Sequence, residues 1–236
     1  LGDLDAAAAA YARALAVAPA NQLIRWETSL VYAQMAAVAK TTPRTDLLAQ
    51  LLAGQLDAPG NLIKSLFCTD QGAASCYRGQ TAYEQAFATG PRGQKLRAPA
   101  LFLHPPASVA IALRVPAERA ALHFLIGLDP AAREWQTDGA TFRVWVTAPD
   151  GKRVLATELT VDRETAVRGW VPGWADLRPW AGQSITLTLE SDAGPNGDPT
   201  DDWFAWGEPS LTTPPAARYA TEQPELRAQE LRKGLK

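Results

Sequence analysis

One polar loop near the end of the chain concentrates side chains that could hold a cation. The loop is SDAGPNGDPTDD, residues 191–202, and its candidate ligands are Asp192, Asp198, Asp201 and Asp202. Carboxylate oxygens are the ligands that Ca²⁺ prefers, and Gly194 and Gly197 give the backbone freedom to fold around an ion. We predict no cofactor, and the one metal that this loop could hold is a structural calcium ion without a catalytic role. A solvated connecting turn is the alternative.

A second group of candidates lies on predicted strands and could contact a sugar. In the strand at 141–147, Phe142, Val144 and Val146 share one face, so Arg143 and Trp145 lie on the other. A flat aromatic ring can stack on a pyranose while Arg or His bonds its hydroxyl groups. The alternative is that Trp145 packs under a covering loop or against the helical part.

His123 is the third glycan-binding candidate. It is out of phase with Leu122 and Phe124, so it faces away from them, on the opposite sheet surface or as a minor core partner.

The other histidine, His104, lies between an apolar strand and two prolines. We expect its ring to hydrogen-bond a neighbouring backbone group and fix a corner. No G-x-S-x-G, H-E-x-x-H or P-loop motif accompanies either histidine, so we predict no catalytic residue and no enzymatic activity.

The two cysteines bear on the compartment. Cys68 and Cys76 enclose the turn-forming residues of CTDQGAASC. A disulfide between them would stabilise the chain by about 2.5 kcal/mol and would persist only in an oxidising compartment. Two buried free thiols are the alternative. With two distant histidines, the cysteines do not form a recognisable zinc ligand set.

Composition is that of an ordinary globular chain. The 236 residues are 47% hydrophobic and 20% charged, with a formal net charge of −2, which does not indicate a nucleic-acid partner. No apolar run reaches the roughly 18 residues that a membrane-spanning helix needs. The chain starts without Met, and its first residues resemble the inside of a helical motif. We expect it to be the C-terminal part of a longer polypeptide.

Hydrophobic periodicity changes along the chain. Residues 1–58 are rich in Ala and Leu at helical spacing, including a predicted helix at 46–56, and residues 97–213 alternate with period two. The predicted strands are 100–103, 109–115, 121–128, 141–147, 153–161, 184–190 and 203–211, and PDG at 149–151 predicts a hairpin turn. The predicted fold class is α+β and multidomain, with helical hairpins at 1–58, a linker with a possible disulfide loop at 59–96, an antiparallel β-sandwich jelly roll at 97–213 and a helical arm at 214–236.

Two resemblances refine this organisation. The first helix resembles the second half of a tetratricopeptide repeat, in the positions of Gly2, Leu4, Ala7, Tyr11, Ala14, Leu15 and Pro19, with Asn21 following. Residues 97–213 resemble the galactose-binding-like jelly roll of carbohydrate-binding modules. The stretches that carry this second resemblance are LFLHPP, LHFLIGLDP, DGATFRVWV, DGKRVLATELTV, DLRPWAGQSITLTLES and DDWFAWGEPSL.

The combination resembles the extracytoplasmic C-terminal portions of bacterial membrane glycosyltransferases and O-antigen-ligase-like proteins. It implies a non-catalytic extracytoplasmic module that binds a glycan or docks a protein subunit. The parent would be membrane-associated through upstream segments or partners, at the cell surface or in a periplasm-like space. The alternatives are an accessory domain of a membrane glycosyltransferase whose catalytic part lies upstream, and a structural subunit of a membrane complex.

The first testable prediction is that Cys68 and Cys76 are joined. Peptide mass spectrometry of non-reduced, natively isolated protein should find the two cysteines in one cross-linked species. Two thiols that react with an alkylating reagent before reduction would contradict both the bridge and the oxidising compartment.

Overall fold

The computed structural model describes residues 44–57, 63–65, 80–89, 95–130, 132, 136–167 and 169–213, and single positions between 7 and 31. The chain divides into two compact units, Met35–Pro214 and a second made of Leu1–Gln34 with Pro215–Lys236. In the second unit the singly described positions, which include Ala7, Tyr11 and Ala14, are all helical. The remaining repeat-like positions, the predicted arm at 214–236, and Cys68 and Cys76 lie outside the described residues. The disulfide therefore stays a prediction.

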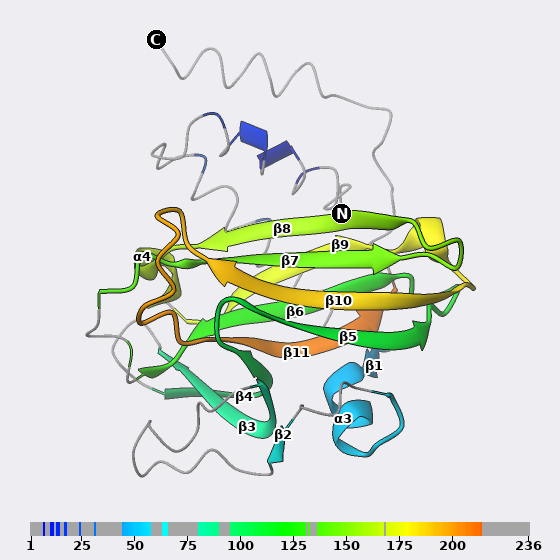
Figure 1. Cartoon of the computed structure of the whole chain (residues 1–236), viewed down its shortest axis with the longest axis horizontal. Coiled ribbons are helices and arrows are strands. Elements are labelled where there is room, and N and C mark those ends of the chain that lie inside the picture. The colour runs from blue at the N-terminus through cyan, green and yellow to red at the C-terminus, as the bar shows by residue number, and fades with distance from the viewer. Residues whose placement is uncertain are drawn as a thin grey trace. The chain divides into compact units, whose positions relative to one another are not determined.

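The unit Met35–Pro214 is a sandwich of two β-sheets, seen edge-on in Figure 1. The larger sheet runs in the order β2 (Ile63–Ser65), β3 (Gln80–Thr89), β4 (Lys95–Leu103), β11 (Phe204–Thr212), β6 (Ala121–Leu128) and β9 (Val171–Asp176), and β1 (Arg44–Asp46) pairs with β11. The smaller sheet runs β5 (Ala107–Arg114), β10 (Ser184–Ala193), β7 (Ala140–Thr147) and β8 (Arg153–Val161). All of these pairs are antiparallel except β2 with β3.

Aromatic side chains from both sheets fill the space between them. The Trp206 ring of β11 lies 4.8 Å from the ring of Phe124 and 5.5 Å from that of Phe142, measured between centroids. Phe142 comes from the smaller sheet and contacts Phe204 edge-on at 5.6 Å. All four side chains have no exposed surface, and the Trp206 indole N–H donates to the Ser191 hydroxyl at 3.0 Å. The core therefore satisfies the one polar group that Trp206 brings into it.

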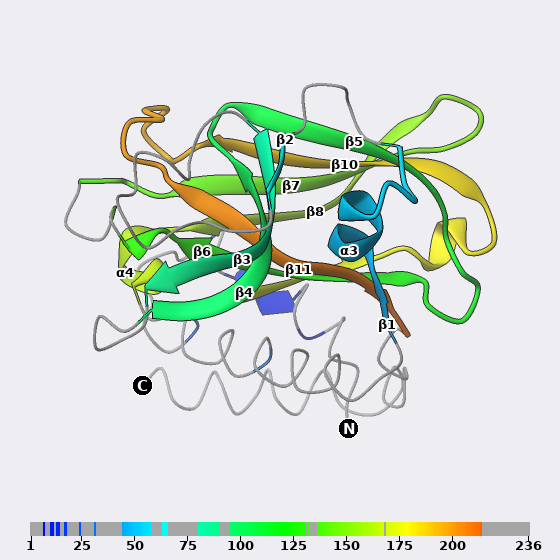
Figure 2. The ribbon, with the colours of Figure 1, turned by 90° about the horizontal axis from the view of Figure 1, so that it is seen from below.

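The α+β fold class predicted from the sequence is wrong. The described residues of the unit Met35–Pro214 form a β-sandwich with two short α-helices, α3 (Leu47–Leu52) and α4 (Arg163–Ala166), and the described part of the chain does not show the predicted N-terminal helical hairpins. Residues 44–46, assigned to the helical region, form β1 instead. Figure 2 shows α3 beside β1 and β11.

The leucine stripe of α3 explains this difference. Asp46 caps the helix by accepting the Ala49 N–H at 2.9 Å, and Leu47, Leu48 and Leu51 are fully buried in the core of the sandwich. Helical spacing predicted the helix correctly, although it is shorter than expected. The apolar face packs against a sheet rather than against a second helix, and spacing alone cannot distinguish the two partners.

Most of the predicted strands are confirmed, and two long ones were missed. β3 lies in the segment assigned to a linker, and β9 has the sequence VPGWAD, in which Pro172 and Gly173 obscure any alternation. β9 is an edge strand, where a proline is tolerated because one side makes no ladder bonds. The turn predicted at PDG is confirmed: the Ala148 N–H donates to the Lys152 carbonyl at 2.9 Å, and Gly151 has φ +82°.

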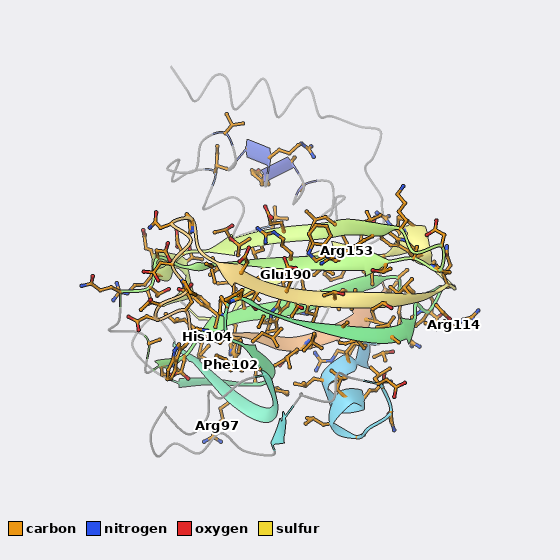
Figure 3. All side chains as sticks on the ribbon, in the orientation of Figure 1. Arg97, Phe102, His104, Arg114, Arg153 and Glu190 are labelled. Atoms are coloured by element: carbon orange, nitrogen blue, oxygen red, sulfur yellow. The ribbon has the colours of Figure 1, made fainter. Side chains whose placement is uncertain are left out.

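The His-Pro-Pro corner carries the chain from one sheet to the other. β4 ends at Leu103 in the larger sheet, and β5 begins at Ala107 in the smaller one. The Nδ1 atom of His104 lies 2.8 Å from the Pro105 carbonyl oxygen, so a protonated Nδ1 donates to it. The His104 ring also meets the Phe102 ring edge-on at 6.2 Å, and Figure 3 shows the two residues together. The expectation that His104 shapes a corner is confirmed.

The second testable prediction concerns the contact between β6 and β9. A Cβ atom at Gly173 would overlap the ring of Phe124, which is buried in the core. Gly173→Ala should therefore lower the free energy of unfolding by about 1–3 kcal/mol, measured by denaturant titration. Ala110→Ser, on an exposed position of β5, is the control and should change it little. An unchanged midpoint for Gly173→Ala would contradict the close packing of these strands.

Candidate functional site

The outward surface of the smaller sheet carries a compact group of charged and aromatic side chains. We call this group the Arg143 face and define it as Arg143, Trp145, Arg153, Glu158, Glu190 and Asp192. The predicted alternation of β7 is confirmed, because Phe142, Val144 and Val146 are fully buried whereas Arg143 and Trp145 are only partly buried on the other side. Figure 3 shows Arg153 and Glu190 near the middle of this sheet.

Arg143 is the centre of the ion pairs on this face. Its Nε donates to Glu158 at 2.6 Å, and its Nη1 donates to Asp192 at 2.7 Å and to Glu190 at 3.2 Å. The hydrogen bonds to Asp192 and Glu158 raise the pKa of the Arg143 guanidinium above its ordinary value. The same Arg143 bond is the main cause that lowers the pKa of Asp192. Arg143 is therefore a fixed cation held by three carboxylates.

Strand register assembles these ion pairs. Arg143 lies directly opposite Glu190 on β10 and opposite Glu158 on β8, while Asp192 is a diagonal neighbour two positions along. An irregularity between Val144 and Trp145 interrupts the pairing of β7 with β8. If the register between β7 and β8 continued unchanged from the hairpin turn, Thr157 would lie opposite Arg143. The bulge therefore brings Glu158 into the group.

Trp145 is held differently from Arg143. The Arg153 guanidinium carbon lies 4.3 Å from the centre of the Trp145 ring, a cation–π contact. The Arg153 side chain is 52% exposed, against 24% for Arg143, and its ion pair with Glu190 is the longer contact of 3.3 Å. In the described part of the chain, the Trp145 indole N–H is buried without an acceptor. One ring face of Trp145 is thus covered by the more loosely held of the two arginines.

The structure does not bring His123 to this face. His123 lies on β6 in the larger sheet, on the side away from the core residues Leu122 and Phe124, and it is 1% exposed. Its ring meets the Trp174 ring of β9 edge-on at 5.9 Å. The phase argument placed His123 correctly on the surface opposite Leu122, but its burial gives it no solvent-facing role in this structure.

The four aspartates of the polar loop do not share one site. Asp192 pairs with Arg143, and the exposed Asp198 accepts the Thr200 N–H at 2.9 Å. Hydrogen bonding from the Thr200 side chain, and then from its backbone, lowers the pKa of Asp198. Asp201 is half-buried and adopts the left-handed φ of +64°. Asp202 alone is buried, with no exposed surface. Among the described residues, no group of three or more His, Cys, Asp or Glu side chains could hold a metal ion together.

Asp202 instead meets residues that precede β7. Its Oδ1 accepts the Thr137 hydroxyl at 2.5 Å, and burial, with a contribution from the charge of Asp138, raises the pKa of the Asp202 carboxyl to about 6. Thr137 and Asp138 escaped sequence reasoning because their partners in the loop, Asp202 and Asn196, lie 65 and 58 positions away. Glu158, Glu190 and Arg153 escaped it because a strand pattern does not specify which residues of neighbouring strands are opposite.

Comparison with known proteins leaves the family open. No protein-family model matches the chain. An uncharacterised protein of Archaeoglobus fulgidus is 32% identical over 97 residues, which are 40% of this chain and 24% of that protein. The chain thus spans about a quarter of the length of this relative.

Several solved structures of carbohydrate-binding modules resemble the sandwich. The CBM51-2 and INT domains of Clostridium perfringens ZmpB align with a TM-score of 0.45 and 16% identity, over 72% of this chain and 32% of that one. The CBM51 of C. perfringens GH95, in complex with methyl-galactose, aligns with a TM-score of 0.42 and 14% identity, over 72% of this chain and all of that one. These two structures bear on the sandwich alone, and the resemblances to a tetratricopeptide repeat and to membrane glycosyltransferases stay predictions.

The third testable prediction concerns the charge balance of the Arg143 face. Arg143→Met should lower the free energy of unfolding by about 1 kcal/mol in dilute buffer, because it leaves neighbouring carboxylates without their shared cation. Most of the loss should disappear in 1 M NaCl, where charges are screened beyond about 3 Å. Arg114→Met, on the exposed Arg114 at one end of the same sheet (Figure 3), is the control. A loss of equal size at both salt concentrations would show that Arg143 acts through packing alone.

Proposed function

We propose that the sandwich is a non-catalytic glycan-binding module and that the Arg143 face binds the sugar. The observation that carries the proposal is the side-by-side placement of a tryptophan ring, two guanidinium groups and three carboxylates on one sheet surface. A tryptophan ring stacks on the apolar face of a pyranose, and fixed charged groups bond the hydroxyls around its edge. Because Arg143 holds its three carboxylates in place, few side chains would need to reorder on binding.

Arg153 is the group that a sugar would displace. It covers the face of Trp145, it is more exposed than Arg143, and its contact with Glu190 is the longer one. A pyranose that replaces it on the ring exchanges a cation–π contact for a stacking contact. The freed guanidinium and the freed Glu190 oxygen can then bond hydroxyl groups of the same sugar.

The charges of the face indicate the class of sugar. Three carboxylates against two guanidinium groups leave the face with a formal excess of one negative charge. Uronic and sialic acids would add a further carboxylate beside Glu158 and Asp192, whose side chains are 47% and 44% exposed. We therefore expect neutral sugars or amino sugars to bind in preference to acidic ones.

A protein-docking role fits this face less well. Among the described residues, Leu155 is the one large apolar side chain of the sandwich that is exposed, at 41%. A stable protein interface usually requires a broader apolar centre than one leucine. Leu155 lies opposite Trp145 and two positions from Arg153, so a polar ligand suits this surface better.

An extracytoplasmic location forms part of the same proposal. It depends on the bridge between Cys68 and Cys76, for which peptide mapping is the test. Within the described residues, no helix is both long enough and apolar enough to cross a bilayer. Association with a membrane-bound partner belongs to the same proposal, and co-purification from membranes is its test.

The fourth testable prediction is the binding experiment. The whole chain is applied to an array that carries plant, bacterial and host glycans. N-acetylglucosamine and methyl-galactose, the sugars in two of the similar structures, serve as soluble probes. Binding to neutral glycans is expected, and Trp145→Ala should weaken it at least tenfold because it removes the stacking surface. Arg114→Met should bind as the parent chain does.

Two outcomes would contradict the proposal. Silence across the whole array would remove glycan binding as the function of this sandwich. Binding that Trp145→Ala leaves unchanged would place the sugar elsewhere.

The variant Arg153→Ala gives a further test, because it uncovers the Trp145 ring. If Arg153 competes with the sugar for the Trp145 ring, Arg153→Ala should increase the association rate constant for sugar binding. Melting curves of each variant verify that it folds.

A further inference from the structure

The chain places one of its own cations on the ring of Trp145. Arg153 lies on β8 and Glu190 on β10, and β7, which carries Trp145, runs between these two strands. The Arg153 guanidinium reaches across β7: its carbon is 4.3 Å from the centre of the Trp145 ring, and its Nη2 donates to Glu190 Oε2 at 3.3 Å. Figure 3 labels both residues on this sheet. An aromatic face and a carboxylate oxygen thus bind one cation together.

Both parts of this cation site are held in place without Arg153. Arg143 donates from Nη1 to the other oxygen of Glu190, Oε1, at 3.2 Å, so the carboxylate keeps its position when Arg153 moves away. Trp145 is half-buried on β7, which is a central strand of the smaller sheet. The ring and the carboxylate therefore stay in register for another cation, and few groups need to reorder when one binds.

Arg153 is free to move away from the ring. Its side chain is 52% exposed and comes from β8, an edge strand of the sheet. Among the described residues, Glu190 is the one carboxylate that forms an ion pair with it. An exposed pair of this kind gains little, because solvent screens the charges and the long side chain loses conformational entropy. A ligand that offers the ring and Glu190 a better cation can therefore displace Arg153.

Displacement of Arg153 changes the charge of the site. The three carboxylates of the Arg143 face then share Arg143 as their one cation, which leaves a formal charge of −2 where the complete face has −1. A neutral sugar that stacks on Trp145 leaves this excess in place and gives up the ion pair with Glu190. A sugar that carries an ammonium group replaces the ion pair and restores the charge.

We propose that the Arg143 face prefers amino sugars with a free, protonated amino group, which takes the place of the Arg153 guanidinium and binds Glu190 Oε2. This inference rests on the proposed glycan-binding function and names the ligand class that binds most tightly. The pyranose stacks on Trp145, and the ammonium group at its edge forms the ion pair. Neutral sugars still stack on the ring but bind more weakly, and N-acetylation of the amino group removes the advantage.

The fifth testable prediction compares methyl glycosides that differ only at carbon 2. The glucose-configured series consists of glucosamine, N-acetylglucosamine and glucose, and the galactose-configured series is titrated in parallel. Ligand-observed NMR on the whole chain in dilute buffer should give a dissociation constant about tenfold lower for the amine than for its neutral counterparts. The preference should shrink in 1 M NaCl and above about pH 8, where such an amino group loses its proton.

Two variants separate the Glu190 carboxylate from the general charge of the protein. Glu190→Gln keeps the shape and a hydrogen-bond acceptor but removes the charge, so the preference for the amine should fall to about twofold or less. Asp198→Asn is the matched control, because it removes one carboxylate at an exposed position outside the face, and it should retain the full preference. Arg153→Ala removes the internal cation and should strengthen binding of the amine more than that of the neutral sugars.

The outcomes distinguish this inference from the function on which it rests. Equal affinity for the amine and its neutral counterparts, or an equal loss of preference in Asp198→Asn, would overturn the inference and leave glycan binding intact. Equal affinity for methylammonium, which has the charge but no sugar ring, would overturn it as well. Silence from both series would also overturn it, and the glycan array then decides whether the proposed function falls too. If Glu190→Gln does not fold, the dependence on pH and salt in the unaltered chain decides.

Discussion

The packing of Trp206 between the two sheets is the contact on which the rest of the sandwich depends. Its ring contacts Phe124 of its own sheet and Phe142 of the other, and its N–H is satisfied by Ser191 of β10. This single side chain therefore ties β11, β6, β7 and β10 together. The hydrogen bond to Ser191 also favours this orientation of the indole, because a buried N–H without a partner is costly.

The packing of the core determines which side chains lie on the outer surface of the smaller sheet. Because successive residues of a strand point to opposite sides, the burial of Phe142 and Val144 directs Arg143 and Trp145 to the outer surface. The same rule on β10 buries Leu189 and Ser191 and presents Glu190 and Asp192. The bulge in the β7–β8 pairing then adds Glu158. The Arg143 face is thus the external side of the same strands that build the core.

The two acidic clusters of the sandwich are balanced in opposite ways. On the Arg143 face the carboxylates are partly exposed, and guanidinium groups neutralise them directly. Around Gly194, Asp202 is buried and Asp138 is half-buried, and one oxygen of each carboxylate accepts a hydrogen bond. The first arrangement pairs its carboxylates with cations, whereas in the second one oxygen of each carboxylate has no hydrogen-bond partner among the described residues. This difference in electrostatics, rather than the number of acidic residues, distinguishes the two clusters.

The sequence by itself determined the features that depend on near neighbours. Alternation identified most strands of the sandwich and the outward position of Arg143 and Trp145, PDG identified the hairpin turn, and the prolines identified His104 as a corner residue. These are local properties, because side-chain direction repeats every two residues and turn conformation follows from residue type. The helix at Leu47–Leu52 was also found from its spacing.

The tertiary structure decided which distant segments meet. It placed α3 on a sheet instead of in a helical hairpin, because an apolar stripe does not specify its partner. It placed Glu158 opposite Arg143 through a β-bulge that the sequence pattern does not predict. It also placed His123 and Trp145 in different sheets. It brought Asp138 to Asp202 across more than 60 positions, since strand pairing and register depend on the packing of the whole core.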